Sequence, residues 1–306
     1  MKNTHSTSEP AQLPAAPPLL ITGKNGTLGQ AFQTLCQLRG LEAVCLSRAE
    51  LDITDEAAIA QALRRYQPWA VINTAGYVRV DDAETDAARC YRENATGPAL
   101  LAQACAAQDI PFLTFSSDLV FDGGQARAYL ESDRAHPLNV YGHSKLLAEQ
   151  AVLTRHPRAL VVRTSAFFSA WDSHNFVHHA LAAARSGQPF AAADNVAITP
   201  TYVPDLVNTA LDLLLDAERG IWHLTNQGTY TWAELARLAV GTAGLDAACV
   251  VPRPLAAFGW AATRPHYSAL SSQQGLLLPT VESGLHRYLA DEQRLRTIEP
   301  IAALVA

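Results

Sequence analysis

A tyrosine and a lysine stand one helical turn apart in the segment Tyr141-Gly142-His143-Ser144-Lys145. Side chains at i and i+4 of a helix project from the same face. A lysine ammonium beside a phenol favours the phenolate, so we expect Lys145 to lower the pKa of Tyr141 from about 10. Such a tyrosine can donate a proton to a carbonyl oxygen while hydride is added to the carbon. The spacing also occurs often by chance, so it identifies no active site on its own.

A hydroxyl that could hold a carbonyl group occurs in the segment Phe115-Ser116-Ser117-Asp118, at the end of an expected strand. Ligands of doubly wound sheets bind at the carboxyl ends of the strands, which places Ser117 where it could contact a substrate ketone. The alternative is that these serines only cap the following turn.

A glycine-rich turn, with glycines at 23, 26 and 29, follows the first apolar run. Glycines at such a turn allow the backbone to approach a pyrophosphate, whose charge lies at the N-terminus of the next helix. The spacing differs from the G-x-G-x-x-G fingerprint, and a purely structural turn is the alternative. The candidate cofactor-binding residues of the turn are Gly23, Lys24, Asn25, Gly26, Thr27, Leu28 and Gly29.

The end of the second expected strand indicates which nicotinamide cofactor is preferred. An acidic residue there would accept hydrogen bonds from the ribose 2′-hydroxyl of NADH, but the chain has Ser47 and Arg48. A hydroxyl and a guanidinium fork suit a 2′-phosphate, so we expect NADPH to be preferred and NADH to be usable. The alternative is that Arg48 is a solvated loop residue, and Glu50 is near enough to complicate the prediction.

Short apolar runs alternate with helical patterns through the first two-thirds of the chain. Strands that are apolar on both faces and separated by helices belong in a parallel sheet covered on both sides. The expected fold is therefore α/β, a doubly wound parallel sheet of the Rossmann type with a smaller C-terminal domain. Strands are expected at 19–22, 43–46, 70–73, 111–115 and 160–163, and helices from 26 and at 57–66, 91–108 and 140–153.

The regular alternation of strand and helix patterns becomes weaker after about residue 165, and seven prolines fall between 189 and 279. We expect a disordered leader at 1–17 and a dinucleotide-binding domain at 18–165. Residues 166–306 then form mainly a substrate-binding domain, with some segments returning to the sheet. A net charge of −6 gives no reason to bind nucleic acid or an anionic membrane. Five scattered cysteines and no long apolar run favour a reducing, cytoplasmic location.

Taken together, the glycine turn, Ser117 and the Tyr141/Lys145 pair resemble the extended short-chain dehydrogenase/reductase family in order and spacing. Further segments are similar to the dTDP-4-dehydrorhamnose reductase family. They are Val80–Glu84, Asn94–Thr96, Ser117–Phe121, Pro137–Gly142, Arg163–Ser165, Pro200-Thr201, Thr231-Trp232, Arg264-Pro265 and Leu278-Pro279. Asn73–Gly76, at the end of the third expected strand, resembles the segment of the short-chain dehydrogenase/reductase family that lines the cofactor.

This resemblance implies reduction of the C4 ketone of a nucleotide-linked sugar by NADPH or NADH. It implies that Tyr141 donates the proton, that Lys145 tunes it and holds the nicotinamide ribose, and that Ser117 binds the ketone. Further cofactor contacts implied by the resemblance are Asp52, Ile53, Asn73, Ala75 and Gly76. The implied substrate contacts are Ser117, Asp118, Ala166, Asn175 and Arg264.

One departure concerns Ala166, which stands where the family commonly has an aromatic residue against the sugar. We therefore expect weak activity on the rhamnose precursor, or preference for a bulkier or differently oriented sugar. Alternative functions are another nucleotide-sugar enzyme, such as an epimerase, and a non-catalytic subunit like the methionine adenosyltransferase β subunit. A homodimer is left open. His174 and His178 lack a third ligand at diagnostic spacing, so no metal site is expected.

Overall fold

The structure is a computed structural model that describes the backbone of residues 16–305 and the side chains of residues 16–297. Of the expected leader, residues 1–15 lie outside the described residues. No helix in the described chain combines the length and the apolar character needed to cross a membrane.

The centre of the molecule is a six-stranded sheet in which every pairing is parallel, in the order β10-β5-β4-β3-β1-β2. Its order reverses between β1 and β3, which is the switch point where doubly wound sheets open a ligand crevice. The expected fold class is confirmed. The strands are β1 (Leu19–Thr22), β2 (Ala43–Leu46), β3 (Ala70–Asn73), β4 (Phe112–Ser117), β5 (Leu160–Thr164) and β10 (Gly220–His223).

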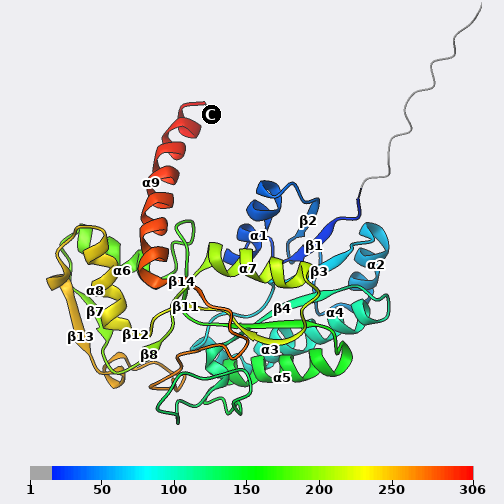
Figure 1. Ribbon diagram of the computed structural model, residues 1–306, viewed down its shortest axis with the longest axis horizontal. Coiled ribbons are helices and arrows are strands. Elements are labelled where there is room, and N and C mark those ends of the chain that lie inside the picture. Colours follow the sequence, from blue (N-terminus) through cyan, green and yellow to red (C-terminus); the bar gives the residue numbers. More distant parts are fainter. Residues whose placement is uncertain (1–15, 306) are drawn as a thin grey trace, which may run out of the picture.

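Helices cover both faces of this sheet (Figure 1). On one face, α1 (Thr27–Leu38) and α7 (Val203–Leu215) share a buried cluster with alternate strand residues such as Ile21 and Ile72. On the other face, α2 (Glu56–Tyr66), α4 (Gly97–Ala106) and α5 (Val140–Arg155) pack on the intervening residues, including Leu20 and Val71. Strands buried on both faces explain the unbroken apolar runs in the sequence.

The single helix expected at 91–108 is wrong in its bounds and its regularity. The structure has α3 (Ala87–Tyr91), then a π-helical turn η2 (Arg92–Thr96), then α4. Pro98 lacks the N–H that would bond the carbonyl four residues earlier, and its ring crowds that carbonyl, so the regular pattern fails before it. β4 also runs two residues beyond its expected end at 115, so that Ser117 closes the strand.

A second apolar cluster lies beside the sheet, built from α6 (Phe176–Arg185), α8 (Trp232–Thr242) and the first turns of α9 (Val281–Val305). In Figure 1 these elements form the lobe opposite α2, and α9 extends away from it. The short strands are β6 (Phe167–Phe168), β7 (Phe190–Ala193), β8 (Ala197–Ile198), β9 (Thr201–Tyr202), β11 (Asn226–Gln227), β12 (Tyr230–Thr231), β13 (Val250–Arg253) and β14 (Leu278–Thr280). The 3₁₀ turns are η1 (Asp82–Glu84), η3 (Asp118–Val120), η4 (Ala247–Cys249) and η5 (Leu255–Phe258).

Helix α5 is held against the sheet with little space to spare. Its N-terminus is capped by Asn139, which accepts from the Gly142 N–H at 2.7 Å. Gly142 lies so close to η3 that a Cβ there would overlap the Leu119 carbonyl oxygen. A glycine therefore lets α5 approach the turn that follows β4.

We expect Gly142→Ala to lower the free energy of unfolding by about 1–3 kcal/mol, the usual cost of overpacking. This steric cost exceeds the intrinsic preference of about 1 kcal/mol for alanine in a helix. Urea denaturation followed by circular dichroism measures the change. Gly241→Ala in α8, where a Cβ meets nothing within 4 Å, is the matched control and should be neutral or slightly stabilising. Equal effects of the two substitutions would contradict the close approach of α5 to η3.

Candidate active site

Two clefts meet at the carboxyl ends of the parallel strands. The sheet-edge cleft, of about 470 Å³, runs past the glycine turn and the ends of β1, β2 and β3. The inter-lobe cleft, of about 680 Å³, lies between the ends of β4 and β5 and the second apolar cluster. Tyr141 and Ser116 line both clefts, so the two meet at the expected proton donor.

The glycine turn leaves no room for larger residues at two of its positions. Gly23 has φ +80°, and a Cβ there would lie 2.7 Å from the Ala75 nitrogen. A Cβ on Gly29 would overlap the Gly23 carbonyl oxygen, so α1 begins directly against the turn. Gly26, the N-cap of α1, supplies no capping side chain, which leaves helix N–H groups available to an anion. The turn therefore fits a pyrophosphate.

Most predicted cofactor-binding residues lie together in the sheet-edge cleft. Lys24 and Gly29 do not line it, since Gly29 faces the turn and serves its close packing. The lining includes Gly23, Asn25, Gly26, Thr27, Leu28, Ser47, Arg48, Asp52, Ile53, Asn73, Ala75, Gly76, Tyr141 and Lys145.

Tyr141 and Lys145 project from one face of α5, with the Lys145 Nζ 5.8 Å from the centre of the Tyr141 ring. Nζ donates a hydrogen bond to the Phe115 carbonyl oxygen at 3.3 Å, which holds the ammonium at the end of β4. Burial lowers the pKa of Lys145 to about 8, against the opposing influence of Cys90 and Glu149. The Lys145 amine therefore loses its proton as the pH rises through about 8, only slightly above neutral pH.

The expected lowering of the Tyr141 pKa is wrong for this structure, because burial of the hydroxyl raises that pKa well above its usual value. The nearby Asp118 carboxylate and Cys90 raise it further, while the Ser117 hydroxyl opposes them. Desolvation, the largest of these causes, disfavours the charged phenolate. Tyr141 therefore keeps its proton at neutral pH.

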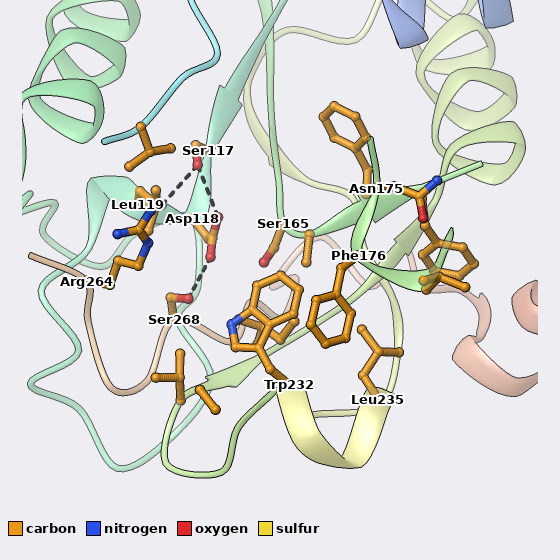
Figure 2. A pocket seen from close by; sticks show the side chains of 18 of the residues that line it. Ser117, Asp118, Leu119, Ser165, Asn175, Phe176, Trp232, Leu235, Arg264 and Ser268 are labelled. Carbon is orange, nitrogen blue, oxygen red and sulfur yellow. Dashed lines mark hydrogen bonds between the residues drawn. The ribbon is translucent and has the colours of Figure 1, made fainter. Parts of the chain in front are cut away.

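Ser117 and Asp118 form a buried polar group in the lining of the inter-lobe cleft. The Ser117 hydroxyl donates to Asp118 at 3.1 Å and accepts from the Leu119 N–H at 3.1 Å. Ser268 donates to the other Asp118 oxygen at 2.6 Å. Burial raises the pKa of Asp118, and the surrounding serine hydroxyls oppose this. Figure 2 shows the chain of hydrogen bonds from Ser117 through Asp118 to Ser268.

Across the cleft from this polar group the lining is mainly apolar. Figure 2 shows Phe176, Trp232 and Leu235 gathered on the side opposite Ser117. The Ser116 hydroxyl is buried and has no partner among the described residues, although it lies where the two clefts meet. A cleft that is polar at one end and apolar elsewhere suits a ligand that has a ring with hydrogen-bonding groups at one end and an apolar or aromatic part at the other.

The other predicted substrate residues also line the inter-lobe cleft, but two of them are already engaged. Asn175 caps α6, accepting from the His178 N–H at 2.9 Å and donating to the Ser169 carbonyl at 2.8 Å. Arg264 binds Asp81 through both terminal nitrogens, at 2.9 and 2.5 Å. Ala166 has φ +39°, a left-handed conformation that is uncommon for alanine.

No group of three or more His, Cys, Asp or Glu side chains that could hold a metal ion occurs within the described residues.

Two acidic side chains contact the residues at the end of β2: Glu50, whose proximity the sequence already showed, and Glu93, to which the sequence assigned no role. Glu93, in the π-helical turn, accepts from Arg48 at 2.5 Å and from Arg89 at 2.7 Å. Glu50 accepts from both the N–H and the hydroxyl of Ser47, at 2.8 and 2.7 Å. Arg48 is therefore an ion-paired side chain that is about half exposed, rather than an unengaged fork.

Asn94, in the same π-helical turn, also had no assigned role. It is 1% exposed, accepts from the Tyr77 N–H at 2.8 Å and donates to Ser144 at 3.0 Å. It thereby joins the loop after β3 to α5. In the sequence, only the resemblance of the segment Asn94–Thr96 to the reductase family pointed to this residue. π-helical turns often mark functional sites, but hydrophobic periodicity does not reveal them.

Comparison with known proteins agrees with this geometry. Residues 18–293 match the family described as the RmlD substrate binding domain. The dTDP-4-dehydrorhamnose reductase of Mycobacterium tuberculosis is 37% identical over 264 residues, covering 85% of this chain and 86% of that protein. The Streptomyces griseus protein of the same name is 36% identical over 264 residues, covering 84% and 86%.

Among solved structures, a dTDP-4-dehydrorhamnose reductase from Bacillus anthracis in complex with NADP superposes with a TM-score of 0.85. It is 29% identical and covers 90% of this chain and 99% of its own. The family match spans nearly all of both lobes and the residues of both clefts. This chain therefore belongs to the RmlD substrate binding domain family, within the extended short-chain dehydrogenases/reductases.

Proposed function

We propose that this protein is an oxidoreductase that reduces the C4 ketone of a nucleotide-linked sugar, with NADPH preferred over NADH as hydride donor. The observation that carries the proposal is the position of Tyr141, which lines both clefts and has Lys145 and Ser117 beside it. The relatives are named dTDP-4-dehydrorhamnose reductases, which supports the same reaction class. The NADP complex of the Bacillus anthracis protein supports the cofactor.

Residues of the sheet-edge cleft would hold the cofactor. Gly23 and Gly26 would admit the pyrophosphate to the N-terminus of α1, and Ser47 with Arg48 would face the 2′-phosphate. The bound nicotinamide supplies the hydride. Gly76 lets the backbone of this cleft lie close to Asn94 and Lys145, since a Cβ there would lie 2.7 Å from the Asn94 Oδ1 and 3.7 Å from the Lys145 Nζ.

Tyr141 would give its proton to the ketone oxygen as negative charge develops there. An alkoxide is a stronger base than a phenolate, so even a tyrosine of raised pKa is a competent donor. The Lys145 ammonium would then stabilise the phenolate that forms. Ser117, whose hydroxyl donates to Asp118 in this structure, would turn toward the ketone oxygen and help to orient it.

Finer parts of the proposal rest on the sequence. Ala166 lines the inter-lobe cleft, and preference for a bulkier or differently oriented sugar stays a prediction. The homodimer, the cytoplasmic location, the absence of nucleic-acid binding and the domain boundary at residue 165 stay predictions as well.

We expect Tyr141→Phe to reduce turnover by about 10²–10⁴-fold, the usual worth of a positioned general acid. The ring stays to fill the same space, so the dissociation constant for NADPH should change little. Oxidation of NADPH with a panel of 4-keto nucleotide sugars, followed by absorbance, measures turnover in wild type and variant. Near-normal turnover in the variant would mean that another group supplies the proton, and no turnover of any sugar by the wild type would contradict the proposed reaction.

We expect the Lys145 amine to titrate with a midpoint near pH 8, because burial destabilises its charged form. Below this midpoint the ammonium is present, and it is lost as the pH rises through it. The chain has three lysines, so ¹³C-methylation of amines gives few NMR signals, and Lys145→Met identifies the relevant one. A midpoint at or above pH 10 would show that the amine is hydrated and not tuned by its surroundings.

We expect Arg48→Ala to weaken NADPH binding by about 1–3 kcal/mol, the range for losing a hydrogen bond to a charged group. NADH, which lacks the 2′-phosphate, should bind almost as before. Glu93 keeps its ion pair with Arg89 in this variant, so its buried carboxylate is not left unpaired. Isothermal titration calorimetry with each cofactor measures both constants. Equal losses for the two cofactors, or a wild-type preference for NADH, would contradict the role of Arg48.

A further inference from the structure

Ser47, directly after β2, forms a small position that can bind an anion. Ser47 directs both its backbone N–H and its hydroxyl toward one point, and Lys24 adds positive charge nearby. The occupant in this structure is a carboxylate oxygen of Glu50, at 2.8 Å from the nitrogen and 2.7 Å from the hydroxyl. Glu50 is exposed, and hydrogen bonds from Ser47 lower the pKa of its carboxyl group, so it is charged at neutral pH.

The neighbouring cation is also shared among acidic groups. Arg48 pairs with Glu93 at 2.5 Å and lies 3.6 Å from Asp52. A phosphate arriving at Ser47 therefore meets the Glu50 carboxylate in direct competition for the same donors, beside a guanidinium that is already partly neutralised. Two anions cannot share this position without strong repulsion, so Glu50 has to leave Ser47 when a phosphate binds there.

We propose that Glu50 is a specificity-determining residue that competes with the 2′-phosphate of NADPH at Ser47, and so limits the preference for NADPH and keeps NADH usable. This inference rests on the proposed function, which places the adenosine ribose of the cofactor at the end of β2. With NADH the same carboxylate has a favourable role, because a ribose 2′-hydroxyl can donate to it. Glu50 therefore acts in opposite directions on the two cofactors.

The test measures binding rather than turnover, with Glu50→Gln in the full-length protein. Glutamine keeps an oxygen that can accept from Ser47 but removes the negative charge. Removing one charge about 4 Å from a phosphate in water is worth on the order of 1 kcal/mol, so the dissociation constant for NADPH should fall about fivefold. The constant for NADH should stay the same or rise. Binding of 2′,5′-ADP should tighten as NADPH does, and binding of 5′-ADP should not.

Two further variants serve as controls. Glu42→Gln removes the same charge just before β2, at the opposite end of that strand, and should leave both cofactors unchanged. Arg48→Ala should shift NADPH in the opposite direction to Glu50→Gln. NADPH binding that is unaltered by Glu50→Gln, or altered equally for NADPH and NADH, would overturn the inference while leaving the proposed function intact. A wild-type protein that binds neither cofactor would overturn the proposed function and this inference with it.

Discussion

The arrangement of the site depends on one buried ion pair, between Arg163 on β5 and Glu149 on α5. The guanidinium donates to both carboxylate oxygens, at 2.8 and 2.6 Å, and both side chains are 3% exposed. Arg163 also lies over the Phe121 ring, with 5.0 Å between its guanidinium carbon and the ring centre. A buried charge that loses its partner typically costs 3–5 kcal/mol, so the pair constrains α5 strongly against the sheet.

Tyr141 and Lys145 lie on this same helix, at its start and one turn further on, so their distances from the strand ends are set by the contacts of α5. The ion pair between Glu149 and Arg163 joins the helix to β5. Asn139 caps its N-terminus, and Asn94 joins it to the loop after β3 through Ser144. The reacting side chains are therefore placed by a rigid helix rather than by a loop. Such support is what a proton donor needs in order to act at a fixed distance.

Much of the fold could be predicted from sequence, because strands buried on both faces leave unbroken apolar runs. The bounds of β1, β2 and β3 agree with the predicted ranges to the residue. The π-helical turn at 92–96 could not be predicted, since one extra residue per turn hides within an alanine-rich helical pattern and only Pro98 hints at a defect.

The clefts bring together nearly all of the predicted site residues, although their individual roles stay proposals. Side-chain pairing is where local reasoning failed. Arg48 pairs with Glu93, which is 45 residues away in sequence, and no local pattern predicts that contact. The balance between burial and charge at Tyr141 likewise depends on how the two clefts enclose its hydroxyl, which i, i+4 spacing does not describe.

The central claim, that the chain transfers hydride to the C4 ketone of a nucleotide-linked sugar, is tested most directly by isotope transfer. NADPH deuterated at the transferring position of the nicotinamide is incubated with the purified protein and a dTDP-4-keto-6-deoxy sugar, and the product is examined by NMR and mass spectrometry. The account predicts one deuterium per product molecule, bonded to C4 of a sugar that now carries a C4 hydroxyl. An unreduced sugar in the presence of bound cofactor, or deuterium at any other carbon, would contradict it.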